Sequence, residues 1–129
     1  MIGLDTNIVI RYLTHDDPAQ TAKAIELFTS LSADAPGFLS LIALVESVWV
    51  LERSYKFTKD EIVLVVETFL RGREVIVERA ELVSQALRTF NATGVNFSDC
   101  VIERCGHAAE CKYTATFDKR ATAAGMHLV

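Results

Sequence analysis

Short apolar runs alternate along the chain with longer stretches in which apolar residues recur every three or four positions. Short runs bounded by turn residues are typical of buried strands, and the longer spacing predicts helices with one apolar face. The pattern predicts strands at 2–5, 38–39, 74–77, 113–116 and 126–129. It predicts helices at 6–13, 18–31, 58–70, 80–90 and 97–110, and a further helix that starts after Ser40 and contains Glu46.

Polar residues mark several of the predicted helix starts. Asp16 or Asp17 precedes Pro18, which suits the first helical turn, and Ser40 can cap the helix that follows it. Thr58 and Glu61 have the spacing of a capping box, in which each side chain accepts a backbone N–H of the other. Strands that alternate with helices predict an α/β fold with a mainly parallel sheet covered on both faces, and the length fits a single domain over residues 1–129.

Composition narrows the class of protein. The net charge of −4 and the pI of about 5.3 count against a protein that coats nucleic acid through bulk charge. The three cysteines form no C-x-x-C pair, so we expect reduced thiols of a cytoplasmic protein rather than disulfides or a zinc site. The first predicted strand begins at Ile2, so no signal peptide is expected. The apolar stretch 37–51 is too short to cross a bilayer, so no membrane association is expected.

Four acidic residues occupy unusual positions. Asp5 and Asp118 end predicted strands, where each can either cap the following helix or face a site at the carboxyl edge of the sheet. Glu46 is the only charged residue between Gly37 and Leu51. It either needs a cation, a partner or a cleft, or it marks the wet edge of an amphipathic helix together with Ser47. Asp99 lies at the start of an apolar helix. Its charge either stabilises the helix N-terminus or binds a ligand.

Taken together, the four positions predict a crevice lined by carboxylates. Converging carboxylates repel one another unless a cation lies between them, and hard oxygen ligands select Mg²⁺ or Mn²⁺. Such ions can orient and activate water for in-line attack on a phosphodiester. The remaining acids on helices and at helix starts have structural roles: Asp16, Asp17, Glu26, Glu52, Asp60, Glu61, Glu67, Glu78, Glu81 and Glu110.

The sequence resembles the PIN-domain ribonucleases, and among them the VapC-type toxins of toxin–antitoxin pairs. The resemblance rests on Leu4-Asp5-Thr6-Asn7, the lone Glu46, Phe97-Ser98-Asp99 and Thr116-Phe117-Asp118, and it covers essentially the whole chain. It implies a three-layer α/β/α sandwich with the first strand central. It also implies endoribonuclease activity that depends on Mg²⁺ or Mn²⁺, a homodimer, and a cognate antitoxin protein.

The resemblance also assigns roles to individual residues. By position, Asp5, Glu46, Asp99 and Asp118 match the acidic quartet, which makes them the predicted catalytic and metal-binding residues. Asn7 matches a residue that steadies the first aspartate, and Thr116 matches a hydroxyl beside the last.

Other residues near the motifs have open roles. Glu103 lies one turn beyond Asp99 and either supplies a fifth carboxylate or, as we favour, faces solvent. Arg11, Lys119 and Arg120 are candidate phosphate contacts, with ordinary solvated charges as the alternative.

Three alternatives compete with this interpretation. Cys100, His107 and Cys111 share a helical face, but their axial spacing prevents them from binding one zinc ion, so we expect the cysteines to pack in the core. An aspartate-nucleophile phosphatase also starts from a strand-end aspartate, but Asn7 stands where that class has a second aspartate. The remaining alternative is a non-catalytic PIN-like module that binds RNA or protein.

Overall fold

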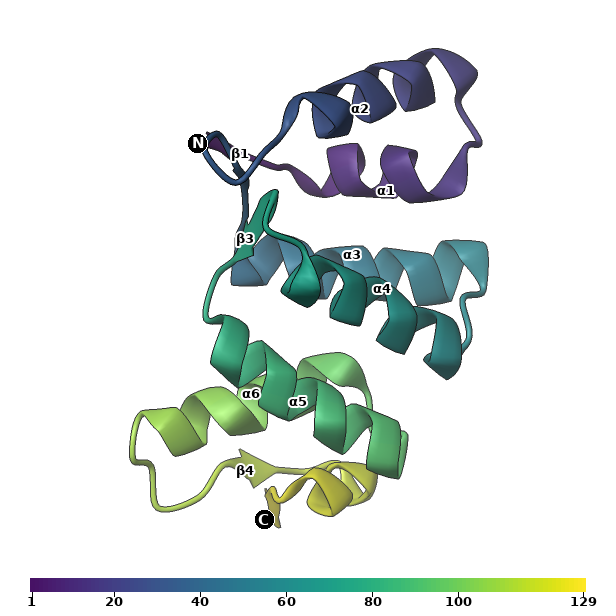
Figure 1. Cartoon of the computed structure of the whole chain (residues 1–129). Coiled ribbons are helices and arrows are strands. Elements are labelled where there is room, and N and C mark those ends of the chain that lie inside the picture. The colour runs from purple at the N-terminus through teal and green to yellow at the C-terminus, as the bar shows by residue number, and fades with distance from the viewer. The chain divides into compact units, whose positions relative to one another are not determined.

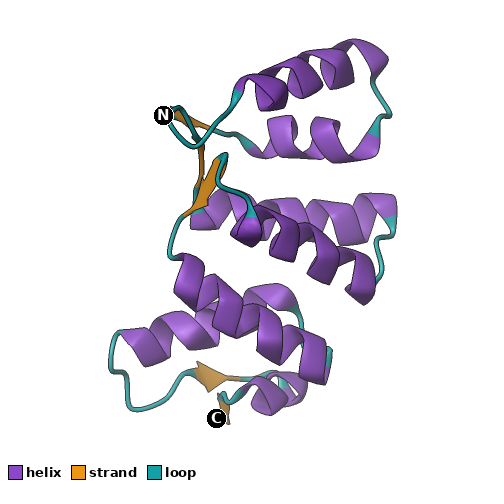
Figure 2. Cartoon of the chain, in the orientation of Figure 1, coloured by secondary structure: helices purple, strands orange, loops and turns teal.

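The computed structural model describes residues 1–129 (Figure 1). The chain divides into two compact units. The first, the N-terminal unit, spans Met1–Glu78, and the second, the C-terminal unit, spans Arg79–Val129. Each unit combines helices with short strands (Figure 2), as the α/β prediction requires. Arg79, the first residue of the C-terminal unit, has a left-handed backbone conformation with φ of 53°.

The N-terminal unit holds three short strands and four helices. The strands are β1 (Ile2–Gly3), β2 (Gly37–Leu39) and β3 (Val75–Val77). The helices are α1 (Thr6–Thr14), α2 (Pro18–Ser30), α3 (Leu41–Tyr55) and α4 (Lys59–Arg71). Each predicted element up to residue 77 is therefore present, with bounds shifted by a few residues.

The strands of the N-terminal unit form one parallel sheet in the order β1-β2-β3. Gly3 pairs with Phe38, and Phe38 pairs with Ile76, so the carboxyl ends of all three strands lie at one edge. In this sheet β1 is an outer strand and β2 is the central strand. The expectation that the first strand is central is therefore wrong for this sheet. The strand is also less buried than predicted, since Ile2 is 45% exposed while Leu4 is in the core.

The helix starts confirm the capping predictions. Asp17 accepts the backbone N–H of Gln20, and Ser40 accepts that of Ala43. Thr58 and Glu61 form a complete capping box at the start of α4. These contacts satisfy backbone donors that a helix leaves unpaired at its first turn. The apolar faces then meet in a core that includes Val9, Leu39, Leu44, Leu51, Ile62 and Val66.

The C-terminal unit holds two long helices, two short strands and a 3₁₀ helix. The long helices are α5 (Ala80–Thr93) and α6 (Phe97–Ala108). The parallel strands β4 (Ala115–Thr116) and β5 (His127–Leu128) flank the 3₁₀ helix η1 (Lys119–Ala124). The sequence pattern did not predict η1, because a single 3₁₀ turn region carries no helical apolar repeat.

The core of the C-terminal unit lies where α5 packs on α6. Phe90 and Phe97 meet edge to face, with ring centroids 5.8 Å apart, and Gly94 supplies the left-handed residue that ends α5. Cys100 is buried and donates its S–H to the carbonyl of Val95, as a core cysteine should. The prediction of core packing is wrong for Cys111, which is exposed.

No helix in the chain is long and apolar enough to span a membrane.

Candidate active site

Asp5 lies between the first strand and the first helix, as predicted, two residues beyond the end of β1 and at the N-cap of α1. Its backbone carbonyl accepts the N–H groups of Ile8 and Val9, which starts the helix. Its carboxylate makes no capping hydrogen bond and no ion pair, and the residue is exposed. Of its two predicted roles, side-chain capping is therefore not observed, and both carboxylate oxygens are available to a ligand.

Glu46 is exposed rather than buried. It lies in α3 beside Ser47, whose hydroxyl donates to the carbonyl of Ala43 and which is only 2% exposed. The argument that burial forces Glu46 to find a partner is wrong, because the carboxylate keeps its water. Glu46 forms no hydrogen bond or ion pair, so it is as available as Asp5. Asn7 is also exposed, and no hydrogen bond joins it to Asp5.

Glu78 is an acid whose position the sequence pattern did not reveal. The prediction that Glu78 lies in a helix is wrong, because Glu78 directly follows β3 and its N–H donates to the carbonyl of Leu39, but the residue is exposed as expected. Its carboxylate accepts the first N–H of α3, from Leu41, at 2.8 Å. The sheet register places Ser40 and Glu78 at the same edge as Asp5. The signal was available, since Glu78 follows a predicted strand as Asp5 does.

The C-terminal unit brings Asp99 and Asp118 together. Both line one pocket of about 280 Å³, with Asn96 and Arg120 among its other walls. Asp99 lies in the first turn of α6, and Asp118 follows β4 at the N-cap of η1. The convergence predicted for these two acids is therefore present within this unit.

The two acids of this pocket differ in their surroundings. Burial raises the pKa of Asp99 above its usual value, nearby Asp118 raises it further, and Arg120 opposes the rise. Asp118 accepts the N–H of Arg120 at 2.9 Å, which confirms its predicted alternative role as a cap, and lies 3.7 Å from the guanidinium. Thr116 lies beside Asp118 as predicted, and its hydroxyl accepts the N–H of Asp118 at 3.0 Å.

Glu103 does not face solvent, so our favoured interpretation is wrong. Its side chain is 13% exposed and its carboxylate accepts the Nε–H of Arg104 at 2.7 Å. Burial, together with the charges of Asp99 and Glu103, raises the pKa of the Cys100 thiol to about 11. Because Arg104 already neutralises it, Glu103 is a poorer candidate for a fifth metal ligand than the four predicted acids.

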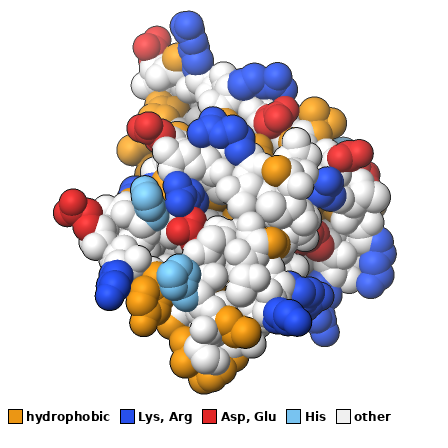
Figure 3. All heavy atoms as spheres, turned by 90° about the horizontal axis from the view of Figure 1, so that it is seen from below, with side chains coloured by type: hydrophobic (Ala, Val, Ile, Leu, Met, Phe, Trp, Pro, Cys, Tyr) orange, Lys and Arg blue, Asp and Glu red, His pale blue; other side chains and the backbone are white.

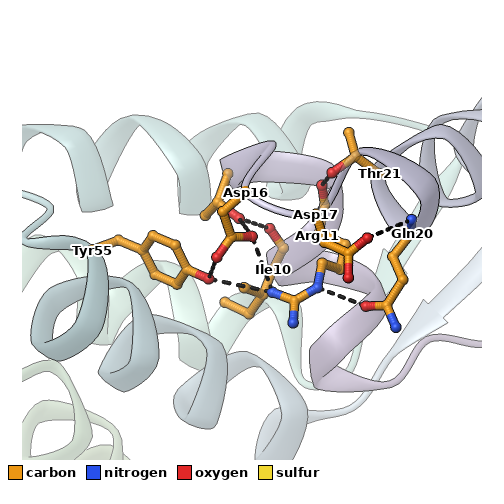
Figure 4. Close-up of polar contacts among 8 residues, drawn as sticks. Ile10, Arg11, Asp16, Asp17, Gln20, Thr21 and Tyr55 are labelled. Atoms are coloured by element: carbon orange, nitrogen blue, oxygen red, sulfur yellow. Dashed lines mark hydrogen bonds and ion pairs between the residues drawn. The ribbon is translucent and has the colours of Figure 1, made fainter.

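The three candidate phosphate contacts are not equivalent. The guanidinium of Arg11 donates to Gln20, Asp16 and Tyr55, and Tyr55 donates in turn to Asp16 (Figure 4). This network joins α1 to α2 and α3. Because its guanidinium already has these partners, Arg11 has a structural role and is a poorer candidate for a phosphate contact. Lys119 is exposed and forms no ion pair, and Arg120 is 86% exposed. Acidic, basic and apolar side chains are interspersed on the face drawn in Figure 3.

The chemistry of the four acids fits a hard cation. Asp5 and Glu46 offer unpaired carboxylate oxygens, and the mutual repulsion of Asp99 and Asp118 is the kind that a divalent ion relieves. Within neither unit do three or more acid, histidine or cysteine side chains gather around one point. The predicted quartet is divided equally, with two acids in each unit.

The fold defines an α/β protein with parallel strands and acids at strand ends, and comparison with known proteins gives the family. A sequence profile of the PIN domain matches residues 2–125, so the chain belongs to the PIN-domain family, as the sequence motifs indicated. The match supports the α/β/α sandwich and runs through both units. The chain is also 26% identical over 128 residues to the VapC ribonuclease of Aquifex aeolicus (strain VF5). The aligned region covers 98% of this chain and 93% of that relative.

Proposed function

We propose that this protein is an endoribonuclease that depends on Mg²⁺ or Mn²⁺ and acts as the toxin of a type II toxin–antitoxin pair. Membership of the PIN-domain family and similarity to a protein named VapC ribonuclease support the activity and the class of substrate. The observation that carries the proposal is the state of the four acids. Asp5 and Glu46 are exposed without partners. Asp99 and Asp118 share a pocket in which their negative charges repel each other.

In this proposal Asp5, Glu46, Asp99 and Asp118 hold the ion, and residues 1–129 act as one catalytic domain. Asp5 and Glu46 would coordinate directly, because nothing else occupies their oxygens. Asp118 would contribute more weakly, because Arg120 and the first turn of η1 compete for it. Asn7 would steady Asp5, and Thr116 already fixes the backbone at Asp118.

The bound ion would supply Lewis acidity and a polarised water for attack on phosphorus. The side chains of this chain would do the rest. Asp99, whose pKa is raised by burial and by repulsion from Asp118, would bind the ion as an ionised carboxylate, because the ion would relieve that repulsion. Arg120, exposed at the pocket wall, and Lys119 would hold the phosphates beside the acids.

The partners follow from the same proposal. A homodimer and an antitoxin both need apolar surface to cover, and α3 exposes Ile42 (81%) and Trp49 (54%) on the helix that carries Glu46. A partner on this face would lie beside an acid of the site, which is where an inhibitory antitoxin would act. We place the protein in the cytoplasm, where its RNA substrate and free thiols are expected together.

A cleavage assay tests the proposal. The purified chain is incubated with single-stranded and structured RNAs in Mn²⁺, in EDTA, and as Asp99→Asn. We expect cleavage that requires both the metal and Asp99. A folded, Mn²⁺-loaded wild type that binds RNA tightly and leaves it uncut would contradict the nuclease and favour the non-catalytic PIN-like binding module.

A further inference from the structure

We propose that Phe117 is a positioning residue that stacks on an unpaired base of the RNA substrate beside the acidic pocket. The proposal rests on the proposed ribonuclease function and deepens it by specifying an unpaired strand at the cut. It concerns a side chain that neither the packing of the core nor the metal site requires.

The exposure of Phe117 sets it apart from the other phenylalanines. Of the seven in the chain, it is the only one in the exposed class, with 87% of its surface accessible. Phe90 and Phe97 in the same unit are 2% and 1% exposed and pack against each other. Single apolar residues on a surface are common, so the location of this ring has to decide its role.

The location ties the ring to the acidic pocket. Phe117 lies outside the pocket wall but directly precedes Asp118, which lines the pocket, and adjacent Cα atoms are only about 3.8 Å apart. The backbone on its C-terminal side is fixed by two hydrogen bonds, from Asp118 N–H to the Thr116 hydroxyl and from Arg120 N–H to the Asp118 carboxylate. A ring presented by a constrained turn loses little freedom when a base covers it.

The charges that follow Phe117 suit the backbone of a nucleic acid. Lys119 is exposed without an ion pair, and Arg120 is 86% exposed and lines the pocket. An aromatic ring next to cations is the combination by which proteins bind single strands, through base stacking and phosphate contact. In a duplex the faces of the bases are already covered by their neighbours, so the ring selects unpaired nucleotides.

The test measures binding separately from cleavage. The full chain is titrated in EDTA, which prevents cutting, with a short single-stranded oligoadenylate that carries one 2-aminopurine. The duplex of the same strand with oligouridylate serves as the paired probe. We expect Phe117→Ala to weaken binding of the single strand by roughly 5- to 100-fold and to reduce the quenching of 2-aminopurine on binding. Binding of the duplex should change little.

Three variants separate aromatic stacking from a merely apolar contact and from a loss of folding. Phe117→Trp keeps an aromatic face and should restore binding, whereas Phe117→Leu keeps an apolar side chain without one and should not. Tyr113→Ala is the matched control, because Tyr113 is an aromatic residue of the same unit that is 49% exposed but stacks on His127. It should bind the single strand as the wild type does. Thermal unfolding of each variant confirms that the fold is retained.

The possible outcomes are decisive. Equal affinity of wild type and Phe117→Ala, or full rescue by Phe117→Leu, would overturn the proposal. So would a Phe117→Ala variant that changes only the oligomeric state in sedimentation, since the ring would then contact protein. Cleavage in Mn²⁺ distinguishes this failure from that of the proposed function. If Phe117→Ala cleaves RNA with an unchanged KM, only the stacking proposal is contradicted. If RNA binding depends on the ring but no RNA is cleaved, only the proposed nuclease activity is contradicted.

Discussion

The two units hold their acids in opposite ways. In the N-terminal unit Asp5 and Glu46 are exposed, without a hydrogen bond or an ion pair. In the C-terminal unit Asp99 and Asp118 line a common pocket, where burial and the Asp118 carboxylate raise the pKa of Asp99 and Arg120 lies 3.7 Å from Asp118. The comparison shows that placing a carboxylate at a strand end does not determine its chemistry. The helix cap and the nearby cation determine how much of its charge is left for a ligand.

The largest effect is expected from removing the charge of an acid with no competing role. Asp5→Asn and Asp99→Asn should each lower the rate of RNA cleavage by at least about 100-fold, because each removes a metal ligand. Initial rates in Mn²⁺ measure the loss, with circular dichroism as the check on folding. Wild-type rates in both variants would show that neither Asp5 nor Asp99 takes part in cleavage.

A smaller loss is expected at Asp118. Asp118→Asn should lower cleavage by roughly 10-fold, since Arg120 already offsets the charge, while asparagine still caps η1. Asp118→Ala should in addition lower the free energy of unfolding by about 1 kcal/mol, because the cap is lost. Denaturant titrations of the two variants separate these effects. If both variants unfold at the same concentration, the cap does not stabilise this unit.

Metal binding should stabilise the fold measurably. At a Mn²⁺ concentration of about 100 times Kd, the linkage between binding and folding is worth roughly 2.7 kcal/mol, and the melting temperature should rise accordingly. Asp99→Asn should reduce the rise, and EDTA should abolish it. Glu103→Gln is the matched control, because Arg104 pairs with Glu103. A larger reduction in Glu103→Gln than in Asp99→Asn would mean that the ligands are misassigned.

The smallest effect concerns the network around Arg11 in the N-terminal unit. The hydrogen bond from Tyr55, with the charge of Arg11, holds the pKa of Asp16 below its usual value of 3.8. The folded state therefore gains stability from ionised Asp16 above that pH and loses it as the pH falls through the lowered pKa. Thermal unfolding of wild type and Asp16→Asn should differ slightly at neutral pH and converge in acid. A difference that persists unchanged at low pH would contradict this origin.

Local signals in the sequence predicted most of the fold. The capping box at Thr58, the cap at Ser40 and the strand-end position of Asp5 depend on neighbours in the chain, and the structure contains all three. The errors concern features set by distant residues. The exposure of Glu46 depends on which face of α3 packs inward, and the low exposure of Glu103 depends on how α6 is covered. A pattern of apolar spacing does not contain that information.

The candidate site shows the same division. The sequence was sufficient to propose the four acids and the hydroxyl of Thr116 as site residues, because the motifs are short and contiguous. It assigned Glu78 to a helix and did not show that Arg11 is occupied by Gln20, Asp16 and Tyr55. Packing between α1, α2 and α3 determines that Arg11 is not free to bind a phosphate. The structure therefore transfers attention from Arg11 to Lys119 and Arg120.

The junction at Arg79 also separates residues that are synthesised early from residues that are synthesised late. When synthesis has reached Arg79, the nascent chain contains Asp5 and Glu46, but Asp99 and Asp118 are still to be translated. For an enzyme proposed to cut RNA, the proposed set of four acids is therefore incomplete at this stage. The nascent chain can bury its first core while it still lacks half of its proposed catalytic acids, and the hazard begins only when the second half emerges.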